Sequence, residues 1–261
     1  MTEQPKSLEQ RRSVAREVLS LMDLTSLNDD DTEDSVAEML NRAVLAPAYP
    51  AAVCVWPRFI PMSLELLKNT AIRVATVTNF PAGQPNPDLA ARETAAAVEA
   101  GCHEVDVVFP YMAFMDNKAS ICRDLVIECC AAVAGKARLK VIIESGMLKE
   151  RDLIRRASDI CLAGGADFIK TSTGKTKVSA SLDAAEVMIE AIRDHGSKAG
   201  FKAAGGIRTV GQSRQYLNLA RKIVNHDWVS PDTFRFGASG LLNDIMVILG
   251  EQENSGGTQG Y

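Results

Sequence analysis

Apolar and polar positions along this chain follow two periods, one typical of buried strands and one typical of amphipathic helices. Short apolar runs bounded by turn residues predict eight strands, at residues 23–25, 51–56, 72–78, 104–109, 138–144, 167–171, 199–204 and 233–238. Ala- and Glu-rich segments between them predict helices at 60–69, 88–100, 118–134, 149–163, 182–194 and 209–224. Two further helices are predicted at 7–22 and 33–45, the second capped by Thr32.

Eight strands that alternate with helices over about 250 residues are typical of a closed parallel barrel. An open doubly wound sheet is the alternative, but it usually has a GxGxxG-type loop after its first strand, and none is present. No linker or change of composition interrupts the pattern. We therefore predict an α/β fold, a (β/α)8 TIM barrel of one domain over residues 1–250, with an N-terminal helix and a flexible Gly-rich tail at 251–261.

Composition and charge exclude several classes of protein. The 261 residues carry a formal net charge of −4 with acids and bases interspersed, so nothing indicates a nucleic-acid-binding surface. The N-terminus does not resemble a signal peptide, and no stretch reaches the roughly 18 apolar residues of a membrane span. The six cysteines form no CxxC pair and the three histidines have no metal-ligand spacing. We therefore expect reduced thiols in a cytoplasmic enzyme without zinc or another cofactor.

Charged residues lie inside several of the predicted apolar strands, although a buried charge is costly unless it is paired. A single lysine of this kind can be explained structurally, either as half of a buried ion pair or as a side chain that extends to the surface. Three lysines and an aspartate on four consecutive strands instead share one barrel interior, which favours an active site at the carboxyl ends of the strands. The polar strand positions are Asp23, Thr25, Asp106, Lys140, Lys170 and Lys202.

Lys170, in the run DFIKTSTGK, is the candidate nucleophile, because a neutral amine forms a Schiff base with a carbonyl substrate. Lysine has an ordinary pKa of about 10.4, so nucleophilicity near pH 7 requires roughly 4 kcal/mol. A second ammonium about 4 Å away supplies on the order of 4 kcal/mol at an effective dielectric near 20. We expect Lys202 to supply most of this shift and burial to add to it. Asp106 and Lys140 are expected to form an ion pair that also moves the proton at the carbonyl.

Gly-rich turns after the last three strands predict where an anion binds. These turns are Gly174-Lys175, AAGGIR at 203–208 and FGASG at 236–240. In barrels, the loops after strands seven and eight commonly hold a phosphate through backbone amides. Arg208 could pair with this phosphate or lie in solvent. Three other positions stay open: Cys54 as a core residue or one facing the site, Glu144 as a catalytic or lysine-orienting residue, and Asn79 as a turn residue.

Together these segments resemble the deoxyribose-phosphate aldolase family. MDLTSLNDDDT, EVDVVFPY, LKVIIESG, ADFIKTSTGK, GFKAAGGIR and RFGAS match its motifs in order, from about residue 20 to residue 250. The resemblance implies a metal-free (β/α)8 class I aldolase. It also implies reversible cleavage of 2-deoxy-D-ribose 5-phosphate, a small phosphorylated sugar, to D-glyceraldehyde 3-phosphate and acetaldehyde. A homodimer is compatible with this resemblance.

The resemblance also implies roles for individual residues. Lys170 would be the Schiff-base lysine, Lys202 the cation that lowers its pKa, and Asp106 and Lys140 the proton-relay pair. Tyr261 matches a closing tyrosine associated with proton transfer at the enamine carbon. The predicted substrate and phosphate site contains Thr25, Gly174, Lys175, Gly205, Gly206, Arg208, Gly237 and Ser239.

Three positions depart from the family pattern: Ala203 replaces a proline, Ser145 a threonine and Gly240 a serine. Gly240 lacks a hydroxyl that could contact the phosphate, so weaker phosphate binding is expected. Two alternatives remain at this point. One is another Schiff-base barrel aldolase, acting on a ketose phosphate or a keto acid. The other is a sugar-phosphate-binding protein without catalysis.

Overall fold

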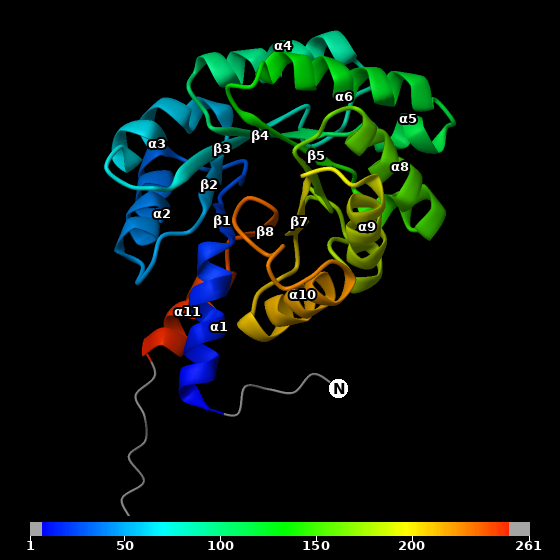
Figure 1. Cartoon of the computed structure of the whole chain (residues 1–261). Helices are drawn as coiled ribbons and strands as arrows, with labels where there is room; N and C mark the ends of the chain where they lie inside the picture. Colours follow the sequence, from blue (N-terminus) through cyan, green and yellow to red (C-terminus); the bar gives the residue numbers. More distant parts are fainter. Residues whose placement is uncertain (1–6, 251–261) are drawn as a thin grey trace, which may run out of the picture.

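The computed structural model describes residues 7–250 and confirms the predicted closed (β/α)8 barrel. Each strand pairs in parallel with its neighbours in sequence, and the first strand closes the barrel against the last (Figure 1). The strands are β1 Met22–Thr25, β2 Ala52–Val55, β3 Arg73–Thr78, β4 Glu104–Val108, β5 Arg138–Ile142, β6 Phe168–Lys170, β7 Gly200–Ala204 and β8 Phe234–Ala238.

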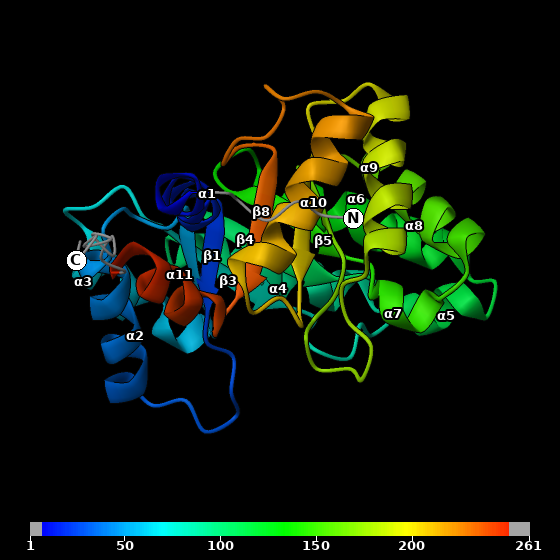
Figure 2. The ribbon, with the colours of Figure 1, turned by 90° about the horizontal axis from the view of Figure 1, so that it is seen from below.

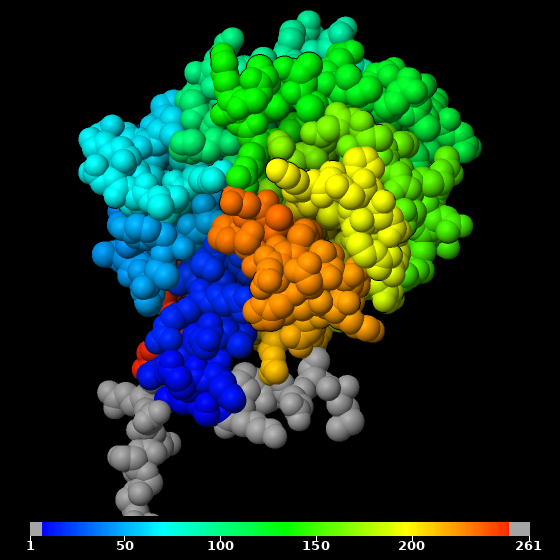
Figure 3. Space-filling view, viewed as in Figure 1, coloured from blue at the N-terminus to red at the C-terminus, as the bar shows by residue number. Residues whose placement is uncertain are grey.

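Helices surround this barrel, as the end-on view of Figure 1 and the turned view of Figure 2 show. The main ones are α1 Leu8–Ser20, α2 Glu33–Leu45, α3 Ile60–Leu67, α4 Pro87–Glu99, α6 Ala119–Val133, α8 Arg151–Ala163, α9 Leu182–His195, α10 Val210–Ile223 and α11 Leu241–Gly250. Helix α1 packs against α10 and α11, so the two ends of the described chain lie side by side, and Figure 3 shows the contact with α10. No helix among the described residues is long and apolar enough to cross a membrane.

Several of these helices begin at a side-chain cap, close to the residue where the sequence predicts the helix to start. The Thr32 hydroxyl accepts a hydrogen bond from the Ser35 amide and forms a capping box at α2, because the first amides of a helix lack partners within it. Ser7 and Thr209 form the same box at α1 and α10. Four elements were not predicted: η1 Pro57–Phe59, α5 Tyr111–Met115, α7 Ser145–Leu148 and α11.

Strand positions alternate between the helical layer and the barrel interior. In β4, Val105 and Val107 belong to the apolar core beneath the helices, so Glu104 and Asp106 point inward. In β7, Phe201 and Ala203 belong to that core and Lys202 faces inward. A smaller apolar cluster forms another part of the interior and contains Leu27, Ala52, Cys54, Ala75 and Val77. The barrel interior is therefore apolar near β2 and β3, and its charged residues come from the other strands.

The cysteines are unpaired, and His103 makes a contact between two strands. All six cysteines are free thiols. The Nδ1 atom of His103 accepts a hydrogen bond of 2.9 Å from the backbone amide of Val74, which joins the edge of β4 to β3. This contact gives His103 a structural role.

Candidate active site

The strand register places the predicted lysines and aspartate at neighbouring inward positions of the barrel. Asp106 lies opposite Lys140, and Lys202 lies between Lys170 and a residue of β8, Arg235. All of these side chains are buried. Because inward positions on adjacent strands meet inside a closed barrel, the charges converge on one another.

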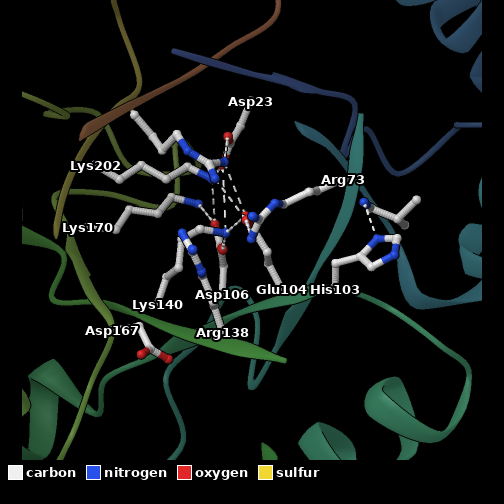
Figure 4. Close-up of polar contacts among 12 residues, drawn as sticks. Asp23, Arg73, His103, Glu104, Asp106, Arg138, Lys140, Asp167, Lys170 and Lys202 are labelled. Carbon is white, nitrogen blue, oxygen red and sulfur yellow. Dashed lines mark hydrogen bonds and ion pairs between the residues drawn. The ribbon is translucent and has the colours of Figure 1, made fainter. Parts of the chain in front are cut away.

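Asp106 is the centre of this cluster (Figure 4). Its Oδ2 atom accepts hydrogen bonds of 2.8 Å from the Nζ atoms of both Lys170 and Lys202. Its Oδ1 atom accepts one of 2.9 Å from Lys140 Nζ. The expected pair of Asp106 with Lys140 is present, and the same carboxylate also holds the other two lysines.

A second set of charges lies beneath Asp106. Asp23 contacts Lys202 and, at 2.6 Å from its Oδ1 atom, Arg235 Nη1. Glu104 lies 2.5 Å from Lys140 Nζ and 2.8 Å from Arg235 Nη2. Glu104 and Arg235 were not among the predicted site residues. The signal was present for Arg235, which lies between two apolar residues of β8 as Lys202 does in β7, and Glu104 lies two residues before Asp106 on the same face of β4.

Lys170 differs from the other buried cations in the direction of its pKa shift. Burial lowers the pKa of Lys170, the ammonium of Lys202 lowers it further, and Asp106 opposes both. Burial alone would also lower the pKa of Lys140 and Lys202, but nearby carboxylates outweigh it and raise both values. Lys170 is therefore the lysine of the three that most readily loses its proton.

This result corrects the sequence-based prediction of how much Lys202 lowers the pKa of Lys170. Lys202 was expected to supply most of the pKa shift of Lys170, whereas burial is the larger cause. The reason is geometric, because Asp106 lies 2.8 Å from both ammonium groups and offsets much of their repulsion.

The carboxylates are ionised and Cys54 is neutral. Burial would raise the pKa of Asp106, but Lys140, Lys170 and Lys202 together hold it well below its usual range. Burial, with the nearby Asp106, raises the pKa of the Cys54 thiol to about 11. Cys54 therefore lies in the barrel interior near the lysines as an uncharged apolar group.

A cleft of about 530 Å³ opens at the carboxyl ends of the strands and reaches Lys170. Three Gly-rich turns, after β6, β7 and β8, form much of its wall. The lining residues that the sequence predicts for the substrate site are Thr25, Gly174, Lys175, Gly205, Gly206, Arg208, Gly237 and Ser239. All eight predicted positions thus surround one cleft with Lys170 at its base.

Two glycines in these turns are required by their surroundings. Gly205 has a φ of +85°, and a Cβ atom there would lie 2.6 Å from the side chain of Ser179. A Cβ atom on Gly237 would lie 3.0 Å from Cε of Lys202. Gly240, in contrast, has open space around it. An alanine at Gly205 would therefore be strained, and a side chain at Gly237 would crowd Lys202.

The model of the DeoC/LacD family of aldolases matches residues 17–243. The chain belongs to this family. A Toxoplasma gondii structure described as a candidate deoxyribose-phosphate aldolase is 26% identical, with a TM-score of 0.86 over 93% of this chain and 96% of that one. A similarly described structure from Coccidioides immitis is 25% identical, with a TM-score of 0.74 over 94% and 88% of the two chains.

The Aeropyrum pernix deoxyribose phosphate aldolase, described as tetrameric, is 21% identical with a TM-score of 0.73, over 94% of this chain and 97% of that one, and shows the shared fold alone. The homodimer considered for this DeoC/LacD-family aldolase stays a prediction. No group of three or more His, Cys, Asp or Glu side chains suited to a metal ion occurs between residues 7 and 250.

Two polar residues of this aldolase have structural roles. In the described part of the chain, no lysine forms an ion pair with Glu144. Its carboxylate accepts hydrogen bonds from the hydroxyls of Thr173 and Thr176, and from the Thr173 amide, which secures the turn after β6. The side-chain amide of Asn79, a residue with a φ of 51°, donates to the backbone oxygens of Gln84 and Val108 and so stabilises a turn. Tyr261 lies outside the described residues.

Proposed function

We propose that this aldolase reversibly cleaves 2-deoxy-D-ribose 5-phosphate to D-glyceraldehyde 3-phosphate and acetaldehyde through a Schiff base on Lys170. The observation that carries the proposal is a single buried lysine with a lowered pKa at the base of a cleft lined by Gly-rich turns. The two structural relatives at 25–26% identity, both described as candidate deoxyribose-phosphate aldolases, support the choice of substrate.

The reaction begins when the unprotonated Nζ of Lys170 attacks the C1 aldehyde of the open-chain sugar. The carbinolamine loses water and gives a protonated imine, which acts as an electron sink. The 3-hydroxyl loses its proton, the C2–C3 bond breaks, and its electron pair forms the enamine. Glyceraldehyde 3-phosphate leaves, and protonation at C2 followed by hydrolysis releases acetaldehyde and regenerates the amine.

Asp106 and Lys140 are proposed to move protons in these steps, directly or through a water. Asp106 lies 2.8 Å from Lys170 and 2.9 Å from Lys140, so a proton can pass between the carbinolamine and the pair. Lys202 is proposed to keep the Lys170 amine neutral and to stabilise developing negative charge. For Tyr261, proton transfer at the enamine carbon remains a proposal.

The phosphate is proposed to bind the backbone amides of the Gly-rich turns. Gly174, Gly205 and Gly206 have φ values of +80°, +85° and +80°, a conformation that makes close backbone approach possible. Lys175 and Arg208 line the same cleft and supply positive charge. Lys175 is held 3.5 Å from the exposed Asp29, a weak pair that a phosphate can displace.

A comparison of substrates tests the proposed function. The purified protein is expected to cleave deoxyribose 5-phosphate faster than ketose phosphates or keto acids, in a coupled assay for the aldehyde products. Faster cleavage of a ketose phosphate or a keto acid would show another barrel aldolase. Binding of deoxyribose 5-phosphate without turnover would show a sugar-phosphate-binding protein.

The role of the turns can be tested with a pair of glycine variants. Gly205→Ala is expected to raise KM for deoxyribose 5-phosphate about tenfold or more, because a left-handed backbone and a steric clash cost on the order of 1–3 kcal/mol. Gly240→Ala is the matched control, because a Cβ atom there meets nothing within 4 Å. Cleavage of unphosphorylated deoxyribose should change little in either variant. Equal KM values for the two variants would argue against phosphate binding at Gly205.

A further inference from the structure

Arg235 is a fully buried arginine that does not line the cleft. Its guanidinium contacts Asp23 at 2.6 Å and both carboxylate oxygens of Glu104 at 2.8 and 3.2 Å. Its Nε atom donates to the backbone oxygen of Pro231 at 2.5 Å. The guanidinium carbon lies 5.7 Å from the ring centroid of Phe168. Four groups therefore fix the position of this charge.

Two carboxylates connect Arg235 to the lysines. Asp23 contacts both Arg235 and Lys202, and lies 3.7 Å from Lys140. Glu104 contacts both Arg235 and Lys140. Lys170 contacts neither of them, because Asp106 is its one carboxylate partner among residues 7–250. Arg235 thus acts on Lys170 through shared partners and touches no reacting atom.

The charges in this closed set do not balance when every group is ionised. Three buried carboxylates, Asp23, Glu104 and Asp106, face four buried cations, Lys140, Lys170, Lys202 and Arg235. An arginine keeps its charge in proteins. Lys140 and Lys202 each contact at least two carboxylates, whereas Lys170 shares its single one with both of them. The set becomes neutral when Lys170 loses its proton.

The neighbouring groups leave this count unchanged. Arg73, on β3, lies 3.6 Å from Glu104, but it is 40% exposed and also pairs with the exposed Asp232. Cys54 on β2 and Cys102, before β4, are neutral thiols, because burial raises both pKa values to about 11. Lys170 is therefore the member of the cluster whose positive charge is least compensated by neighbouring carboxylates.

We propose that Arg235 is a positioning residue that keeps Lys170 unprotonated. Its positive charge balances part of the negative charge of Asp23 and Glu104. The carboxylate charge that remains in the cluster balances Lys140 and Lys202 only. This inference rests on the proposed Schiff-base reaction and adds to it the residue that sets the charge state of its nucleophile. Removing the Arg235 charge leaves three carboxylates for three lysines, so Lys170 would retain its proton.

The pH dependence of kcat/KM for deoxyribose 5-phosphate tests the inference. Arg235→Met is expected to move the acidic limb of this pH profile to higher pH by about one unit or more. At pH values on the acidic side of the limb, kcat/KM should therefore fall about tenfold, and it should recover at higher pH. Arg235→Lys, which keeps the charge, should retain the wild-type profile. Arg138→Met is the control, because the Arg138 side chain pairs with the exposed Asp232 and, among the described residues, forms no ion pair with a carboxylate of the cluster.

Glu104→Gln provides a prediction of opposite sign. It removes a carboxylate, so the acidic limb should move downward, and the double variant with Arg235→Met should return it toward the wild-type position. An unmoved limb in folded Arg235→Met, or an upward shift in Glu104→Gln, would overturn the inference. If Arg235→Met does not fold, the direction of the shift in Glu104→Gln still tests the inference. A wild-type enzyme that fails to cleave the substrate would instead refute the proposed function.

Discussion

Replacing Lys170 with methionine is expected to lower turnover of deoxyribose 5-phosphate by about 10⁵-fold or more, the scale seen when a covalent nucleophile is removed. Methionine has a similar length but no amine, so neither the carbinolamine nor the imine can form. Steady-state assays at high enzyme concentration would measure the loss. Lys175→Met is a matched control in the same cleft, expected to weaken substrate binding and to leave kcat near its normal value.

The Lys170→Met variant should also remain folded. Asp106 keeps Lys140 and Lys202 as partners when the third amine is absent, so no carboxylate is left unpaired. In the charge state proposed above Lys170 is neutral, so removal of its amine also leaves the buried charges balanced. An unchanged or higher Tm is therefore expected. Near-normal turnover in a folded variant would exclude imine chemistry at this position.

Asp106→Asn is expected to destabilise the protein by about 3–5 kcal/mol, the usual cost of removing one partner from a buried ion pair. Three lysine side chains lose a shared carboxylate, and an amide has similar shape but no charge. Turnover should fall as well, because the proton relay is removed. Urea unfolding at neutral pH, followed by circular dichroism, would measure the change in the free energy of unfolding.

The stability difference between wild type and Asp106→Asn should depend on pH. The folded pKa of Asp106 lies well below its usual value, so its contribution is fully present above about pH 4, the unfolded value. That contribution is lost as the pH falls from there toward the folded pKa. The two unfolding free energies should therefore converge in acid. A constant difference down to strongly acidic pH would show that the carboxylate charge is not the source of the stabilisation.

Most of the barrel could be predicted from sequence because its signals are local. Each strand is a short apolar run between turn residues, and the longer amphipathic helices show a clear helical period. Helices such as Tyr111–Met115 and Ser145–Leu148 are too short for a period to appear. The helix Leu241–Gly250 was missed for another reason, since its run of apolar residues obscures the period.

The four central site residues could be predicted because charge inside an apolar strand is unusual. Lys140, Lys170 and Lys202, with Asp106, were expected to share the barrel interior, and the structure brings them together. Arg235 has the same local pattern, but its partners Glu104 and Asp23 lie 131 and 212 residues away in sequence. No local pattern reports such a contact.

The relative effects of burial and of Lys202 on the pKa of Lys170 could not be predicted from the sequence either. It depends on the position of Asp106, which lies at equal distance from two ammonium groups and weakens the effect of each on the other. Strand assignment places three side chains in one interior but does not fix the distances among them. The direction of the Lys170 pKa shift was nevertheless predicted correctly.

Borohydride trapping in the presence of deoxyribose 5-phosphate, followed by peptide mapping, tests the central claim most directly. Reduction of the imine should inactivate the enzyme and add the mass of the reduced substrate fragment to the peptide that contains Lys170, and to no other. The Lys170→Met variant should incorporate none. Label on Lys140 or Lys202, or full activity after treatment with substrate and borohydride, would contradict the account.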